Sequence, residues 1–158
     1  MKYINLETGL KIVIEDKFIY NLYQFGLEHY PNEFGGILLG RYSDDRKTLN
    51  IIETILPENF KSTKYSFHRD TKDLKGKLEL KFNGTPSLYY VGEWHTHPDN
   101  PAIPSQIDIN AMDEIINHPD VFILNPVLVI LDISPSHIDF AVYIKFKDKM
   151  YKYEKETE

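Results

Sequence analysis

Cysteine is absent from the 158 residues of this chain, so disulfide bonds and a cysteine nucleophile are excluded, and a metal would have to be bound by histidine and carboxylate side chains. Long apolar runs are also missing: no segment approaches 18 apolar residues, and residues 1–10 do not resemble a signal peptide. Lysine and arginine number 18 against 24 aspartates and glutamates, and this net charge of −6 argues against nucleic acid or an anionic membrane as a partner. We therefore expect a soluble, cytoplasmic protein.

The order of the apolar patterns predicts one domain in which helices and strands alternate. We assign residues 1–147 to this domain and residues 148–158 to a charged, frayed C-terminal tail. Helical spacing predicts helices over residues 17–30, with Asp16 as N-cap, 70–82 and 105–117. Strands are predicted over residues 11–14, 36–42, 49–56, 88–95, 127–133 and 138–146. This order favours an α/β fold of the α+β type, with a mixed, curved sheet flanked by about three helices.

The most informative segment is His95-Thr96-His97-Pro98, which follows the aromatic and β-branched residues of a predicted strand. On a strand, side chains two residues apart share a face at a spacing of about 6.6 Å, so His95 and His97 can converge on one ion. Asp108 offers a third, anionic ligand eleven residues after His97. Three protein ligands and an open position are typical of a hydrolytic zinc site.

The residues around Asp108 predict the start of a helix. Ser105 is a suitable N-cap, and an acidic residue three positions later completes a capping box. Asp108 would then lie in the first turn of a rigid helix that faces the histidines. Taken singly, each of these residues is also explained as a surface histidine or a capping acid, but the whole set in this order favours a metal site.

This pattern, His-Thr-His-Pro followed after six residues by Ser-x-x-Asp, resembles the signature of the JAB/MPN metalloprotease family, also called JAMM. The family motif includes an upstream glutamate before a glycine-containing apolar strand, and Glu33 matches it. The resemblance spans roughly residues 18–144 and implies the cytidine-deaminase-like MPN fold. It further implies one Zn²⁺ per chain held by His95, His97 and Asp108, with Glu33 as general base and Ser105 as a donor to the developing oxyanion.

These implied roles agree with elementary chemistry. A carboxylate near the metal can take a proton from water and return it to the leaving amine, which suits Glu33 at a helix–strand junction. The hydroxyl of Ser105 can accept a capping hydrogen bond while its own hydrogen stays free to donate. Considered alone, Glu33 is better explained as a solvated loop acid after Pro31, and only the accompanying motif favours catalysis.

The resemblance implies a peptidase or isopeptidase that cleaves after the C-terminus of a conjugated protein. The chain has no obvious insertion for gripping a second ubiquitin, and its motifs look most like the stand-alone deconjugating peptidases of bacterial ubiquitin-like conjugation operons. We therefore expect a protein substrate with a flexible C-terminal tail, either a ubiquitin-like protein or, as leading candidate, a CD-NTase conjugate of CBASS antiphage defence. One alternative is a JAMM peptidase that trims a sulfur-carrier protein to expose its C-terminal Gly-Gly. The second is a non-catalytic MPN scaffold, which is disfavoured because all five motif residues are present.

Three other features have more than one interpretation. His68 could contact substrate, although a surface or packing role is the simpler explanation. His118 follows the third predicted helix, where a C-terminal cap is favourable. Residues 59–65 lie between predicted elements and could flank a groove in which an extended substrate tail binds by strand addition.

Overall fold

The structure is a computed structural model that describes residues 1–72 and 74–157, so Asp73 and Glu158 lie outside the described residues. Its three helices are α1 (Asp16–His29), α2 (Leu74–Phe82) and α3 (Gln106–Asn117). The strands are β1 (Lys2–Ile4), β2 (Lys11–Ile14), β3 (Gly35–Tyr42), β4 (Thr48–Ile55), β5 (Phe60–Thr63), β6 (Ser66–Arg69), β7 (Tyr89–Pro98), β8 (Val127–Ser134), β9 (His137–Phe146), β10 (Lys149–Lys152) and β11 (Glu154–Lys155). Among the described residues, no helix is long and apolar enough to span a membrane.

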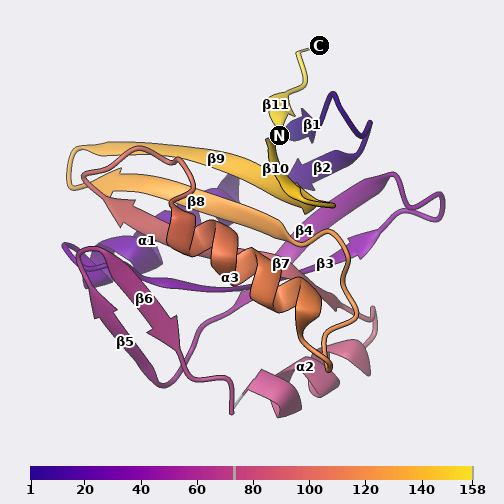
Figure 1. Cartoon of the computed structure of the whole chain (residues 1–158), viewed down its shortest axis with the longest axis horizontal. Coiled ribbons are helices and arrows are strands. Elements are labelled where there is room, and N and C mark those ends of the chain that lie inside the picture. The colour runs from indigo at the N-terminus through magenta and orange to yellow at the C-terminus, as the bar shows by residue number, and fades with distance from the viewer. Residues whose placement is uncertain (73, 158) are drawn as a thin grey trace.

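One large sheet organises the molecule. Nine strands follow the order β10-β9-β8-β7-β3-β4-β2-β1-β11, and β5 pairs with β6 in a separate hairpin. The pairs β2–β4 and β7–β8 are parallel and the other pairs are antiparallel, so the sheet is mixed. The prediction of a mixed, curved sheet with three flanking helices is therefore confirmed (Figure 1).

Strand β8 forms the centre of the core because it is buried on both faces. One face of β8, which includes Val129 and Leu131, belongs to the cluster that contains Ile19 and Leu22 of α1. Leu128 and Ile130 point to the other face and join the cluster that includes Met112 of α3. A strand covered on both faces reads as a continuous apolar run, which explains the sequence Val-Leu-Val-Ile-Leu. Helices α1 and α3 thus cover opposite faces of the sheet (Figure 1).

The C-terminal residues close the sheet, and the prediction of a frayed tail is wrong. Strand β10 pairs with β9, and β11, one residue further on, pairs with β1 at the opposite end of the strand order. Between them, Tyr153 is buried and its backbone N–H donates to the Val142 carbonyl at 2.8 Å. Lys11 also binds Glu156 at 2.7 Å. Figure 1 shows the yellow C-terminal strands beside the indigo N-terminal ones.

Two further boundary predictions need correction. Helix α1 begins at Asp16, and Glu15, in extended conformation, occupies the N-cap without a side-chain hydrogen bond. Helix α2 begins later than predicted, because residues 70–72 are not helical and the first described residue of the helix is Leu74, residue 73 lying outside the described residues. The Asp70 carboxylate instead accepts the Lys72 N–H at 2.9 Å, a local turn that competes with helix formation.

Candidate active site

Strand β7 presents the two histidines on the sheet face that α3 covers. In the parallel register with β8, His95 lies beside Ile130, a residue of the α3-side cluster, and His97 lies beside Asp132. The intervening Thr96 points to the opposite face, where it is fully buried. The alternation of a strand therefore places both imidazoles on one side, as the spacing predicted.

Close backbone approach is needed where β7 meets its neighbours. A Cβ atom on Gly35, which pairs with His95, would lie 2.2 Å from the Trp94 carbonyl oxygen. A Cβ atom on Gly92 would lie 1.9 Å from the Val127 carbonyl oxygen. Both glycines are therefore required for the tight pairing that fixes the histidine-bearing end of β7.

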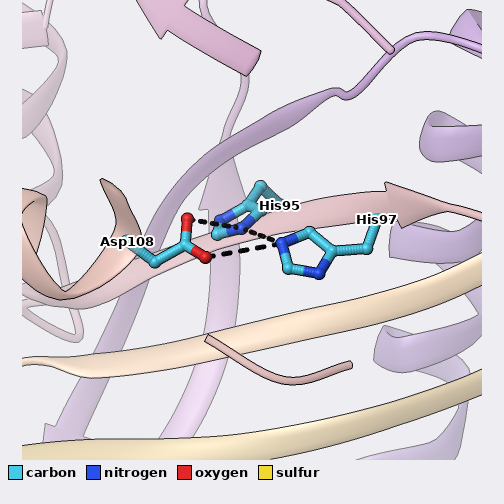
Figure 2. A group of neighbouring side chains, drawn as sticks. All are labelled: His95, His97 and Asp108. Carbon is cyan, nitrogen blue, oxygen red and sulfur yellow. Dashed lines mark hydrogen bonds and ion pairs between the residues drawn. The ribbon is translucent and has the colours of Figure 1, made fainter. Parts of the chain in front are cut away.

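Asp108 reaches the histidines from the first turn of α3. The predicted capping box is present: the Ser105 hydroxyl accepts the Asp108 N–H at 3.2 Å, and the Ser105 N–H donates to Asp108 Oδ2 at 2.6 Å. This second bond fixes the carboxylate, which Figure 2 shows pointing at both imidazoles.

The spacing of the three side chains suits a tetrahedral metal ion. His95 Nε2 lies 3.0 Å from His97 Nε2 and 3.1 Å from Asp108 Oδ1, and His97 Nε2 lies 3.5 Å from Asp108 Oδ2. Ligand atoms around a tetrahedral zinc, with bonds of about 2.0–2.2 Å, are about 3.3–3.6 Å apart. Within the described part of the chain, these three residues form a group whose ligand atoms lie close enough together to hold one metal ion.

A hydrogen bond on the far side of His97 fixes which ring nitrogen faces the cluster. His97 Nδ1 lies 3.0 Å from the Pro101 carbonyl oxygen, which can only accept, so Nδ1 carries the hydrogen. The lone pair of Nε2 then faces His95 and Asp108. Such a carbonyl partner is typical of metal-binding histidines, and converging acceptor atoms of this kind require a cation or protons between them.

The electrostatics of the cluster favour positive charge. Burial lowers the pKa of His97, but the contacts with Asp108 and the Pro101 carbonyl and the charges of Asp108 and Glu33 outweigh it, so this pKa is raised. Burial raises the pKa of Asp108, yet the histidines and the Ser105 N–H lower it far more, and it lies well below its ordinary range. Asp108 is therefore an anion at neutral pH, and the raised pKa of His97 means that a metal ion would compete with protonation of this imidazole.

Glu33 lies between α1 and β3 within the electrostatic influence of the cluster. Burial raises the pKa of Glu33, His95 and His97 lower it, Asp108 raises it and His68 lowers it, with a net increase. The Glu33 N–H donates to the Thr63 carbonyl at 2.8 Å, so the end of the β5–β6 hairpin adjoins this residue. A carboxylate with a raised pKa near a group of potential metal ligands suits proton transfer.

The remaining candidate residues lie as follows. The Ser105 side chain serves as the cap, and its hydroxyl hydrogen has no acceptor among the described residues. His68 is an exposed residue of β6 whose charge influences Glu33, so the structure brings it toward the site. His118 occupies the C-cap of α3, where its N–H donates to the Ile115 carbonyl, and this prediction is confirmed.

The sequence reasoning missed a network that ties the hairpin to the end of β7. Asp99 accepts hydrogen bonds from Tyr30 at 2.9 Å and from Lys64, at the hairpin turn, at 3.1 Å. Asp99 has a φ of 57°, which few residues other than glycine adopt. Its place directly after the His-Thr-His-Pro segment was the only available signal.

Comparison with known proteins identifies the family. Residues 16–143 match the model of the prokaryotic homologs of the JAB domain. This chain belongs to that family. A relative from Enterobacter hormaechei subsp. hoffmannii (strain UCI 50), named CD-NTase/cGAS isopeptidase, is 36% identical over 126 residues, which are 79% of this chain and 69% of the relative. The JAB resemblance is thus confirmed, and with it the prediction of a hydrolytic enzyme of the JAMM type.

A solved structure supports the fold independently of sequence. The solution structure of a Desulfitobacterium hafniense protein superposes with a TM-score of 0.65 at 19% identity, covering 89% of this chain and 88% of that one. At this level of identity the match concerns the fold alone, and it agrees with the arrangement of sheet and helices described above.

Proposed function

We propose that this JAB-family protein is a zinc-dependent isopeptidase that releases a conjugated protein by cleaving after its C-terminal residue. The convergence of His95, His97 and Asp108, at separations of 3.0–3.5 Å beside Glu33, is the observation that carries this proposal. In this proposal the three converging side chains hold the metal. Bound zinc would supply Lewis acidity and a water whose pKa is lowered to about 7.

The chain's own residues would perform the proton transfers. Glu33 is proposed to take a proton from the attacking water and to return it to the leaving amine, which a raised pKa favours. Ser105 is proposed to donate its free hydroxyl hydrogen to the oxyanion that develops on the scissile carbonyl. The capping bond does not interfere, because there the Ser105 oxygen acts as acceptor.

For the substrate, we propose a CD-NTase conjugated through its C-terminus, as the name of the Enterobacter relative suggests. Its flexible tail would lie extended beside the β5–β6 hairpin, whose Thr63 carbonyl contacts Glu33. We propose that residues 1–147 form the catalytic domain, with the following residues as its closing strands.

The test is cleavage of a fusion in which the cognate CD-NTase C-terminus precedes a reporter protein, with the cut mapped by intact mass. We expect a cut at the junction that is lost with a chelator and in Glu33→Gln. Efficient trimming of a sulfur-carrier tail to Gly-Gly, with no cut in the fusion, would favour the alternative function. If neither substrate were hydrolysed, the result would favour the alternative of a non-catalytic MPN scaffold.

A further inference from the structure

Thr96 connects the histidine-bearing strand to the loop that carries Glu33. It lies between His95 and His97 in sequence, but its side chain is fully buried on the opposite face of the sheet. Its hydroxyl oxygen accepts the Phe34 N–H at 2.9 Å, and its own backbone N–H donates to the Phe34 carbonyl at 2.8 Å. Both bonds therefore hold the residue that directly follows Glu33.

The surroundings make this connection rigid. The Phe34 ring stacks on His29 at a centroid distance of 3.7 Å and meets the Trp94 ring edge-on at 6.0 Å. On the other side of the loop, the Glu33 N–H is bound to the Thr63 carbonyl. Backbone hydrogen bonds therefore hold the chain at Glu33 itself and at Phe34, and those at Phe34 connect it to the strand that carries the histidines.

Both branches of the threonine side chain have a partner. A Cβ atom on Gly26 of α1 would lie 2.6 Å from the Thr96 methyl carbon, so the absence of a side chain at position 26 makes room for that methyl. The methyl contact holds the rotamer in which the hydroxyl faces Phe34. Serine keeps this hydroxyl, whereas valine keeps the shape but leaves the buried Phe34 N–H without an acceptor.

We infer that Thr96 is a positioning residue that sets the place of Glu33 relative to His95 and His97. The inference rests on the proposed function, because it assigns Glu33 the proton transfers. Thr96 touches no reacting atom and acts only through the backbone of Phe34.

The first test compares Thr96→Val with Thr96→Ser in the fusion-cleavage assay. Because small displacements of a catalytic group are costly, we expect Thr96→Val to lower kcat about 10- to 100-fold with KM changed less than about twofold. Thr96→Ser should stay within about threefold of wild type, and zinc content should be equal in all three proteins. In a Glu33→Gln background, adding Thr96→Val should lower kcat by less than about twofold further. The effects of residues that act through one another are not additive. An equal loss in both backgrounds would overturn the inference.

The second test does not depend on activity. In the cobalt-loaded protein, the pseudocontact shift of a ¹³C-labelled Glu33 carboxyl reports its place relative to the metal. We expect this shift to change in Thr96→Val and to be preserved in Thr96→Ser, while the Met112 amide of α3 keeps its shift in both. Should Thr96→Val fail to fold, Thr96→Cys replaces it, because a thiol is a weak acceptor and the same change is expected. An unchanged Glu33 shift would refute the role of Thr96, whereas a wild-type protein that cleaves no conjugate would refute only the proposed function.

Discussion

Strand β7 carries two polar clusters whose compositions differ in one respect. At Glu93, one carboxylate oxygen accepts hydrogen bonds from the Arg69 guanidinium and from the Tyr90 hydroxyl, the latter at 3.1 Å, so each of these contacts joins a donor to an acceptor. The buried Nε of Arg69 has no partner among the described residues. Two residues later, the Nε2 atoms of His95 and His97 converge with the Asp108 carboxylate, and no Lys or Arg side chain of residues 1–72 and 74–157 supplies a fixed donor to them. The carboxylate of the first cluster already has its donors within the protein, whereas the atoms of the second cluster require a cation or protons between them. Burial and charge are similar in the two clusters; what separates them is whether a fixed cation of the protein already faces the carboxylate.

The largest effect that tests this comparison is the loss of the proposed general base. We expect Glu33→Gln to lower kcat by about 10²–10⁴-fold, because the amide cannot take up the proton, while zinc content and fold stay unchanged. Steady-state cleavage of the reporter fusion and metal analysis measure the two quantities. Glu28→Gln, on the exposed face of α1, is the matched control and should cleave like wild type. Loss of zinc in Glu33→Gln would instead make Glu33 a ligand.

Disrupting the cluster around Glu93 should lower the stability of the fold and leave metal binding unchanged. Arg69→Met removes the counter-charge of Glu93, both side chains being less than a fifth exposed, and should lower the free energy of unfolding by about 2–3 kcal/mol. Urea denaturation measures this loss, and Lys61→Met on the exposed face of β5 should change stability by less than about 0.5 kcal/mol. If Arg69→Met lowered zinc affinity without destabilising the fold, the two clusters would not be separate.

A smaller loss of stability is expected when a single hydrogen bond is removed from the cluster around Glu93. Tyr90→Phe removes one hydrogen bond to Glu93 and should cost about 1 kcal/mol of stability at neutral pH. Burial, followed by the charge of Glu93, raises the pKa of Tyr90 well above its ordinary value, so the hydroxyl stays a donor up to alkaline pH. Denaturation curves of the two proteins from pH 7 to pH 9 should therefore keep a constant separation. A separation that vanished within this range would mean that the hydroxyl ionises there.

The smallest expected effect concerns the stability of the metal-free protein. The pKa of Glu33 is raised in the folded state above its ordinary value of 4.5, so ionised Glu33 destabilises the fold. This cost is absent at low pH, where folded and unfolded states both bind the proton, and it develops fully as the pH rises through the raised pKa. Metal-free Glu33→Gln should thus melt higher than wild type at pH 7, with the difference closing below pH ~4. A lower melting temperature at pH 7 would contradict the burial of the carboxylate.

Local sequence signals were enough to predict the convergence of His95, His97 and Asp108. The alternation of β7 and the capping box at Ser105 and Asp108 both operate over a few residues, and the structure has them as expected. The β5–β6 hairpin and the closing strands β10 and β11 could not be predicted in this way. Their residues are mostly charged or exposed, so they lack the apolar alternation that indicates a strand. Strand β11 also depends on a partner far away in sequence, because Lys155 pairs with Tyr3. The contact between Glu33 and Thr63 is equally non-local, and no spacing rule indicates it.

Metal affinity tests the central claim most directly. Protein purified without chelator should contain about one zinc per chain, and competition with a chromophoric chelator should give a defined affinity for the wild type. We predict that Asp108→Ala loses this affinity, because two imidazoles without the carboxylate hold zinc weakly. Glu114→Ala, on the same helix, should bind like wild type. An Asp108→Ala protein that kept one zinc at wild-type affinity would contradict the assignment of His95, His97 and Asp108 as the metal site.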